Sequence, residues 1–407
     1  MKRLGNLWPR ITAFDNLYLA WRKARRGKAN RRSTAEFALH LETELLTLQR
    51  ELCAGDYWPG AYRLFTLYER KPRLIAAAPF RDRVVHHAVM NCLEPLLDRT
   101  FIFDSYACRN NKGAHRAVAR YQGWCKGYAY ALKMDVARYF PSLDHLLLKE
   151  KLRRRIKDPP LLALLDRIID TSPEFPPEPT PLFPGDDLLT AAERRTGIPI
   201  GNLTSQFFAN LYLDDFDHWM KETLGVAGYL RYVDDMVVLG NDTQRLRELR
   251  AAARERLAQE RLVLHPRKAE ISRVWDGLDL LGYRVFPDFR LLRNDNGHRF
   301  ARALRRMADA YEAGRLEWHE LNPRVQSWIG HARQADSWGL RKAIFSRTVF
   351  RRGRDQEVSG ASAAARGTTN RGTPARRTAT GTPPATGTTT SVCASPSLPA
   401  IAGVAPR

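Results

Sequence analysis

The sequence predicts an α+β protein in which helices surround a small antiparallel sheet and an all-helical region follows. Three observations lead to this prediction. Apolar residues recur at helical spacing in several segments, beginning with residues 33–48. Residues 228–240 read as two short apolar strands joined by a tight turn. From residue 351 to 407 aliphatic periodicity ends and threonine, glycine, alanine, arginine and proline dominate, so this tail is expected to be disordered.

The remaining elements are predicted from the same two periodicities. Helices are predicted over residues 33–48, from about 81 to 93, and over 146–169, 204–224 and 243–262. Strands rich in β-branched and aliphatic residues are predicted over 129–139, in both arms of 228–240 and over 279–287. Residues 171–197, rich in proline, glycine and acidic residues, are predicted to form a surface loop. Helices with three tryptophans that we expect to be buried reach about residue 350: Trp318, Trp328 and Trp338.

The composition narrows the class of partner. The 407-residue chain suits two to three domains, and its net charge of +22 favours a polyanion, with nucleic acid first and an anionic membrane surface second. No apolar stretch is long enough to span a bilayer, and the first residues lack the apolar core of a signal peptide. We therefore expect a cytoplasmic protein with no membrane partner. The five scattered cysteines form no CxxC pair, which argues against zinc and against a disulfide framework.

The segment Gly228–Gly240, GYLRYVDDMVVLG, carries an unusual turn. Asp234 and Asp235 are expected at the tip of the hairpin, where a two-residue turn normally carries Asn-Gly or Asp-Gly. One interpretation is a surface turn with two solvated acids. The other is a pair of metal ligands that the tight hairpin fixes in position.

Two further segments favour the metal interpretation. In ALKMDVARYFPSLDH, residues 131–145, an apolar strand ends at Asp135 and the aromatic pair Tyr139-Phe140 follows. In GIPIGNLTSQFFANLYLDDFDH, residues 197–218, a glycine and proline turn leads into a helix. An acidic strand end beside an acidic hairpin can hold two divalent ions about 3.5–4 Å apart. Oxygen ligands favour Mg²⁺, so two Mg²⁺ ions are the expected cofactors.

These segments resemble the reverse transcriptase family, in the branch near group II intron and diversity-generating retroelement enzymes. The resemblance covers residues 62–347: Tyr232-Val233-Asp234-Asp235 is similar to the YxDD box, and Asp135 to the other catalytic aspartate. It implies an RNA-directed DNA polymerase with a right-hand fold. The implied parts are a helical N-terminal extension (1–60), fingers and palm around an antiparallel sheet (61–290), a helical thumb (291–350) and a disordered tail (351–407).

The resemblance also implies a role for individual residues. Asp135 and Asp234 would bind both metal ions, Asp235 would assist, and the Val136 carbonyl could contribute. Lys268 would be catalytic by protonating the pyrophosphate, and Phe140 would be the steric gate against the ribose 2′-hydroxyl. The remaining residues expected to bind the nucleotide are Lys71, Arg73, Arg81, Ile200, Gly201 and Gln206. The residue pattern alone equally allows a solvated loop for Lys71 and Arg73, a basic surface for Lys268 and a core position for Phe140.

The type of reverse transcriptase is predicted from residues 200–206, IGNLTSQ, where most group II and retron-like enzymes read QGxxxSP. The IGxxxSQ form resembles diversity-generating retroelement enzymes, which copy a template repeat RNA with errors at adenines. Ile200 in place of an amide removes a donor and an acceptor beside the nascent base pair, which predicts weaker discrimination there. No maturase, HNH nuclease or RNase H segment is recognised after residue 350, which argues against a mobile group II intron protein.

The expected partners are a template RNA and primer, deoxynucleoside triphosphates and, by the resemblance, a small basic helical accessory protein. Two alternatives stay open: a retron-like or defence-associated reverse transcriptase, and a catalytically idle RNA-binding relative. The tail has its own interpretations. Read one base back, residues 378–394 can encode an asparagine-rich peptide that resembles the end of a template repeat. A low-complexity tail or a frame error in the gene would give the same composition.

Overall fold

The computed structural model describes residues 2–68, 72–173 and 181–351. The chain divides into two compact units, Met1–Phe289 and Arg290–Arg407. Two sequence predictions fall outside the described residues, the nucleotide contact of Lys71 and the disordered tail after Arg351, and the surface loop predicted over 171–197 does so at residues 174–180. No helix in the described ranges combines the length and the apolar character needed to cross a bilayer.

Five helices build the N-terminal side of the first unit. They are α1 (Trp8–Thr12), α2 (Phe14–Ala24), α3 (Arg32–Leu39), α4 (Leu41–Ala54) and α5 (Phe80–Leu97). Helices α1, α2 and α3 pack on α5, whose sides are mostly buried. The prediction of a single helix over residues 33–48 was wrong, because the backbone at His40 (φ −114°, ψ 33°) ends α3 and begins α4. The break leaves Leu39 79% exposed, although Leu39 lies within the apolar pattern of residues 33–48.

A two-stranded hairpin precedes α5. Strand β1 (Arg63–Tyr68) pairs antiparallel with β2 (Pro72–Ala77), with Arg63 opposite Ala77 and Leu67 opposite Arg73. Strand β1 is largely exposed and β2 is only partly buried, so the hairpin owes little of its stability to the core.

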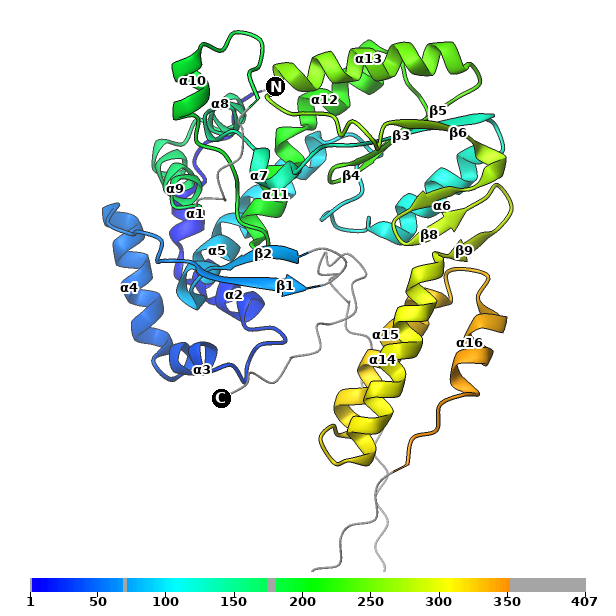
Figure 1. Ribbon diagram of the computed structural model, residues 1–407. Coiled ribbons are helices and arrows are strands. Elements are labelled where there is room, and N and C mark those ends of the chain that lie inside the picture. Colours follow the sequence, from blue (N-terminus) through cyan, green and yellow to red (C-terminus); the bar gives the residue numbers. More distant parts are fainter. Residues whose placement is uncertain (1, 69–71, 174–180, 352–407) are drawn as a thin grey trace, which may run out of the picture. The chain divides into compact units, whose positions relative to one another are not determined.

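The central sheet has four antiparallel strands in the order β4-β5-β3-β6. The strands are β3 (Tyr130–Asp135), β4 (Tyr229–Tyr232), β5 (Asp235–Gly240) and β6 (Glu270–Arg273). Helix α13 (Thr243–Gln259) lies on one side of this sheet and helix α6 (Ala114–Cys125) on the other (Figure 1). Because helices cover both faces, β4 and the middle of β5 are continuously buried, which explains their unbroken apolar runs.

Further helices complete the first unit. They are the 3₁₀ turns η1 (Asp98–Thr100) and η3 (Val274–Asp276), the π-helical turn η2 (Trp219–Thr223), and α7 (Tyr139–Ser142), α8 (His145–Arg155), α9 (Pro159–Asp170), α10 (Leu188–Glu193), α11 (Leu203–Tyr212) and α12 (Asp214–His218). The predicted helix over residues 146–169 is two helices, because Pro159 and Pro160 start α9 and cannot continue α8. The predicted helix over 204–224 is likewise divided, at Leu213 and at the π turn.

Two strand predictions also change. The strand predicted over residues 129–139 ends at Asp135, and Arg138 has a left-handed backbone (φ 49°) before α7. The strand predicted over 279–287 is a hairpin, in which β7 (Leu278–Leu280) pairs with β8 (Tyr283–Val285). Its two turn residues, Leu281 and Gly282, both have positive φ (49° and 93°). A turn of this kind favours glycine, and one glycine within an apolar run was a weak signal for it.

The second unit begins with β9 (Arg290–Leu292) and continues as α14 (Asn294–Glu312), α15 (Trp318–Ala332) and α16 (Trp338–Phe345). Trp328 is buried, stacks on Phe300 with ring centroids 3.8 Å apart and donates from Nε1 to Asn296. The expectation of burial was wrong for the other two tryptophans, since Trp318 is 50% and Trp338 68% exposed. Both begin their helices, and a residue at a helix end is not held against a neighbour by periodicity.

Candidate active site

The turn between β4 and β5 is built from Val233 and Asp234. Tyr232 pairs with Asp235, so Asp235 is the first residue of β5 and not a turn residue, which corrects the expected Asp234-Asp235 tip. Val233 has φ +57°, a left-handed conformation at a position where a two-residue hairpin turn normally carries glycine or asparagine. For a β-branched residue this conformation costs about 1–3 kcal/mol, which the surrounding structure must offset.

The three predicted aspartates meet at one end of the central sheet. Asp135, the last residue of β3, lies opposite Asp235, the first residue of β5. The backbone N–H of Val136 donates to the carbonyl oxygen of Asp234 over 3.4 Å, which ties the end of β3 to the turn. The register of two neighbouring strands thus brings together residues about a hundred positions apart in the sequence.

The electrostatics of this cluster follow from burial and mutual repulsion. Burial, followed by the charges of Asp235 and Asp135, raises the pKa of Asp234 to about 7. Burial also raises the pKa of Asp235, against the opposing effect of Lys133. A group of carboxylates that resists ionisation in the absence of a cation is one that a divalent ion would stabilise in its charged form.

Two lysines lie against the carboxylates. Lys268 Nζ is 2.5 Å from Asp135 Oδ2, and Lys133 Nζ is 3.5 Å from Asp235 Oδ1. The loop that carries Lys268 is itself tied to β3, because the N–H of His265 donates to the carbonyl of Asp135 over 2.8 Å. The predicted catalytic lysine is therefore brought to the aspartates by backbone contacts as well as by its charge.

The donor chemistry of the cluster suits a hard cation. Carboxylate and carbonyl oxygens are the ligands that Mg²⁺ prefers, and the repulsion between the aspartates would be relieved by a divalent charge. In the arrangement described, however, no three His, Cys, Asp or Glu side chains of the described segments are grouped closely enough to hold a metal ion. The oxygen ligands of these residues are chemically suited to Mg²⁺. In the structure, however, Asp135 is paired with Lys268.

Phe140 lies five residues after Asp135, in the short helix α7. Its side chain is half-buried at the edge of the core, and its ring meets that of Tyr139 edge-to-face at 5.9 Å. The carbonyl of Phe140 accepts a hydrogen bond of 3.0 Å from the N–H of Ile198. This bond connects the predicted gate to the segment that leads to Ile200.

Ile200 and Gly201 lie against the β1–β2 hairpin. The carbonyl of Ile200 accepts from the N–H of Ala76 on β2 over 3.4 Å. Gly201 has φ +115°, and a Cβ there would stand 3.5 Å from the Ile75 side chain, so backbone conformation is a stronger reason for glycine than lack of space. The structure thus joins this segment to the strand that carries the exposed Arg73.

The other two predicted nucleotide-binding residues differ in their surroundings. Gln206 is half-buried in the first turns of α11, and its N–H donates to the carbonyl of Asn202. Arg81 is engaged elsewhere: its guanidinium is 2.6 Å from Glu51 and 3.8 Å from Glu44 on α4, and it lies over the Tyr57 ring. The contacts described for Arg81 are therefore with the N-terminal helices and not with the aspartates.

A buried ion pair beside the Val233–Asp234 turn was not predicted from the sequence. Arg231 of β4 and Asp217 of α12 are both fully buried, and Arg231 Nη2 is 2.6 Å from Asp217 Oδ2. Arg231 Nη1 also donates to the carbonyl of Val233 over 3.0 Å. A sequence signal existed, because Arg231 is a charged residue within an apolar strand that a two-sided sheet buries.

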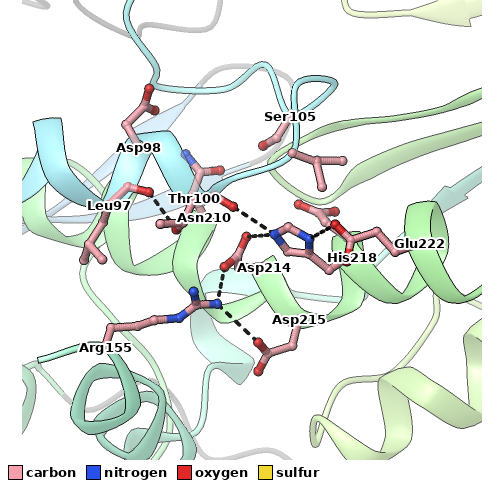
Figure 2. Close-up of polar contacts among 12 residues, drawn as sticks. Leu97, Asp98, Thr100, Ser105, Arg155, Asn210, Asp214, Asp215, His218 and Glu222 are labelled. Carbon is pink, nitrogen blue, oxygen red and sulfur yellow. Dashed lines mark hydrogen bonds and ion pairs between the residues drawn. The ribbon is translucent and has the colours of Figure 1, made fainter. Parts of the chain in front are cut away.

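A second polar network includes residues of α12. Arg155 Nη2 lies 2.6 Å from Asp214 and 3.6 Å from Asp215. Figure 2 shows this guanidinium between the two carboxylates, with His218 held between Thr100 and Glu222. Burial raises the pKa of Asp214 to about 6. The network joins α8, α12 and η1 in one part of the first unit.

Much of this chain is similar in sequence to known proteins. Residues 68–285 match the family model described as reverse transcriptase (RNA-dependent DNA polymerase), which is more than half of the chain. Protein YkfC of Escherichia coli is 25% identical over 286 residues, which cover 60% of this chain and 72% of YkfC.

Longer intron proteins also match. The group II intron-encoded protein LtrA of Lactococcus lactis is 22% identical over 186 residues, or 44% of this chain and 29% of LtrA. The putative COX1/OXI3 intron 1 protein of Saccharomyces cerevisiae is 21% identical over 225 residues, or 55% of this chain and 25% of that protein. The chain therefore spans only about a quarter of the length of these two proteins. With the family model covering most of the first unit, the chain belongs to the reverse transcriptase (RNA-dependent DNA polymerase) family.

Proposed function

We propose that this protein is an active RNA-directed DNA polymerase that extends a primer on an RNA template by two-metal phosphoryl transfer. The observation that carries the proposal is the register of β3 against β5, which sets Asp135 beside Asp235 next to the Asp234 turn. Family membership supports the reaction class, and the aspartate cluster supports retention of the chemistry. The substrates are an RNA template with its primer and deoxynucleoside triphosphates.

In this proposal Asp135 and Asp234 hold two Mg²⁺ ions, with help from Asp235 and the Val136 carbonyl. Ions bound there would supply Lewis acidity to the primer 3′-hydroxyl and to the triphosphate. Lys268 Nζ is 2.5 Å from Asp135 Oδ2, so a metal ion bound at that oxygen would displace the ammonium. The freed ammonium of Lys268 then has a task of its own, which is to donate a proton to the departing pyrophosphate.

The nucleotide would lie between the aspartates and the β1–β2 hairpin. The bond from Ile198 to Phe140 and the bond from Ala76 to Ile200 form a continuous connection between these two regions. On this path Phe140 would exclude the ribose 2′-hydroxyl, and Arg73 and Lys71 would contact the triphosphate. Gly201 and Gln206 would flank the base pair, and Arg81 would have to leave Glu51 in order to reach phosphate.

The right-hand arrangement follows from this assignment. The fingers would be the β1–β2 hairpin with α5, the palm would be the four-stranded sheet with α6 and α13, and the thumb would be α14, α15 and α16. The helices before residue 61 would form the N-terminal extension. The net charge of +22 supports a polyanionic partner for such a protein.

Within the family we propose the diversity-generating type, with errors concentrated at template adenines. The supporting residue is Ile200, whose apolar side chain offers no hydrogen bond beside the nascent pair, while its carbonyl is used by β2. A small basic helical accessory protein would belong to this assignment. The intron-encoded relatives favour a second candidate, a reverse transcriptase of the intron or retron-like type.

Primer extension by the purified full chain tests the proposed function. With Mg²⁺, an RNA template, a DNA primer and all four deoxynucleoside triphosphates, we expect full-length product. Asp234→Asn keeps the shape of the turn but removes a charge that holds the metal, so extension should fall by several orders of magnitude. An inactive wild type would instead support an idle RNA-binding relative, and a variant that keeps a tenth of wild-type activity would overturn the metal-binding role of Asp234. Flanking DNA with two near-identical repeats that differ at adenines separates the two reverse transcriptase types.

A further inference from the structure

A buried arginine, Arg231, donates a hydrogen bond to the turn that carries Asp234. Arg231 is the third residue of β4, its side chain has no exposed surface, and it uses all three guanidinium nitrogens. Nε donates to both carboxylate oxygens of Asp217 at 2.8 and 2.9 Å, and Nη2 donates to Oδ2 at 2.6 Å. Nη1 donates to the carbonyl of Val233 at 3.0 Å.

The bond to Val233 bears directly on the position of Asp234. The carbonyl of Val233 lies in the same rigid peptide plane as the backbone nitrogen and Cα of Asp234. Holding this oxygen therefore fixes the plane from which the Asp234 side chain extends. Val233 needs such a hold, because its φ of +57° is a conformation that a β-branched residue rarely adopts unaided.

Asp217 in turn is placed by more than its charge. Tyr229, two residues before Arg231 in β4, donates its hydroxyl to Asp217 Oδ1 over 2.6 Å. The backbone carbonyl and side-chain oxygen of Asn210 lie 3.3 and 3.4 Å from the guanidinium. Contacts from α11, α12 and β4 therefore converge on one cation whose remaining donor reaches the turn.

We propose that Arg231 and Asp217 are positioning residues for the reaction: they hold the Val233–Asp234 peptide in the left-handed turn that presents Asp234 to the metal ions. The inference rests on the proposed function, because it concerns the same aspartate. A lysine cannot replace the arginine, since one ammonium is a point charge that cannot span Asp217 and the Val233 carbonyl in a fixed plane. Stability alone is a weak explanation, because apolar residues of similar size often replace a buried ion pair without loss.

The primary test is Arg231→Lys, which keeps the positive charge beside Asp217 but removes the planar fork. We expect the variant to fold, its kcat for primer extension to fall by about 100-fold, and its KM for deoxynucleotide to stay near the wild-type value. The Mg²⁺ concentration for half-maximal rate should rise. The matched control is Arg155→Lys, because Arg155 pairs with Asp214 on the same helix α12 at the same 2.6 Å and also lies 3.6 Å from Asp215.

A second readout does not need polymerase activity. Hydrogen exchange of the full chain, followed by mass spectrometry, should accelerate in the peptide that covers residues 229–240 of Arg231→Lys and stay unchanged there in Arg155→Lys. Equal kcat losses in the two lysine variants, or unchanged exchange in the hairpin peptide, would overturn the positioning role. If the wild type extends no primer, the proposed function fails, and the exchange comparison still decides whether Arg231 holds the turn.

A third variant covers the case in which Arg231→Lys does not fold. Replacing both members of the pair by apolar residues, Arg231→Met with Asp217→Leu, leaves no uncompensated buried charge. This double variant should fold and show the same accelerated hairpin exchange and lowered kcat. A folded double variant with wild-type kcat would show that the turn needs no clamp.

Discussion

Lys268 donates from Nζ to Oδ2 of Asp135 over 2.5 Å, so a cation from the loop before β6 engages a carboxylate at the end of β3. In the proposed enzyme this contact has two effects. It neutralises Asp135 while no metal is bound, and it keeps a proton donor within reach of the aspartates. These two effects act on different measured quantities.

Lys268→Met is therefore expected to separate them. The methionine keeps most of the side-chain length but has no charge and no proton to donate, so kcat should fall by about 10²-fold or more. The Mg²⁺ concentration for half-maximal rate should decrease, because no ammonium competes for Asp135. A steady-state Mg²⁺ titration of primer extension measures both. Lys149→Met is the control, since Lys149 pairs with Asp170 at 2.6 Å between α8 and α9. Unchanged kcat in Lys268→Met would assign this lysine to the basic surface.

Phe140→Ala is expected to admit ribonucleotides. The ring is half-buried, so part of it faces out of the core and is free to meet a sugar. Its removal opens space for a 2′-hydroxyl, and the discrimination between deoxynucleotides and ribonucleotides should weaken by about 1–3 kcal/mol. The ratio of kcat/KM for the two nucleotides measures this. Phe140→Tyr retains the ring and should retain selectivity, and an unchanged ratio in Phe140→Ala would make Phe140 a core residue.

The three aspartates could be predicted from the sequence because the signals that indicate them lie in short segments. An apolar strand that ends in Asp135 and a hairpin signal around Asp234 are both visible in short windows, and the family resemblance connects them. The composition of the turn was not predictable in the same way. Whether Asp234-Asp235 or Val233-Asp234 forms the tip depends on the pairing register, and a slip of one residue is set by the packing of the whole strand.

The supporting contacts depend on pairs that are distant in the sequence. Nothing near Arg231 indicates Asp217 as its partner, because the two meet only when β4 packs beside α12. The engagement of Arg81 by Glu51 was missed for the same reason, since α4 and α5 are joined through a hairpin. Helix breaks at His40 and Pro159 show the other limit, in which local backbone geometry interrupts an apolar pattern that continues through it.

The stability of the first unit is expected to decrease as the pH rises above neutrality, because of His218. Its Nδ1 is 2.7 Å from Glu222 Oε1 and its Nε2 is 2.8 Å from the Thr100 carbonyl (Figure 2). Both partners accept, so only the doubly protonated ring can donate to both. Burial alone would lower the pKa of His218, but these bonds and the charges of Asp214 and Glu222 raise it above its ordinary 6.5.

The sign of the pH effect follows from this raised pKa. The stabilisation is fully present below the unfolded value of 6.5 and is lost as the pH rises through the higher folded value. Burial raises the pKa of Asp214 to about 6. Asp214 therefore also lowers the free energy of unfolding as the pH rises, but mainly in the more acidic range between its ordinary 3.8 and about 6. Urea unfolding between about pH 6 and pH 8 should therefore show a falling free energy of unfolding in the wild type. His218→Gln should make this slope shallower, and the part that remains below about pH 7 comes from Asp234, whose pKa burial raises to about 7. A slope in the variant identical to that of the wild type would contradict the role of His218.

Fidelity is expected to depend on Ile200. Its carbonyl is engaged by the N–H of Ala76, so the backbone position is set by β2 and a new side chain can be placed without moving the segment. Ile200→Gln adds a donor and an acceptor beside the proposed base pair. One neutral hydrogen bond contributes about 0.5–1.5 kcal/mol, so the error rate opposite template adenine should fall by about two- to twelve-fold.

The comparison needs a variant that changes shape without adding polarity. Ile200→Leu is that control, because it conserves volume and remains apolar, and its error spectrum should match the wild type. Sequencing of cDNA copied from one defined RNA, at matched nucleotide concentrations, measures all three enzymes. An equal decrease in errors for leucine and glutamine would attribute fidelity to packing and not to a hydrogen bond. A wild-type spectrum without adenine bias, obtained with its template RNA and accessory protein present, would reject the diversity-generating assignment and favour the intron or retron-like type.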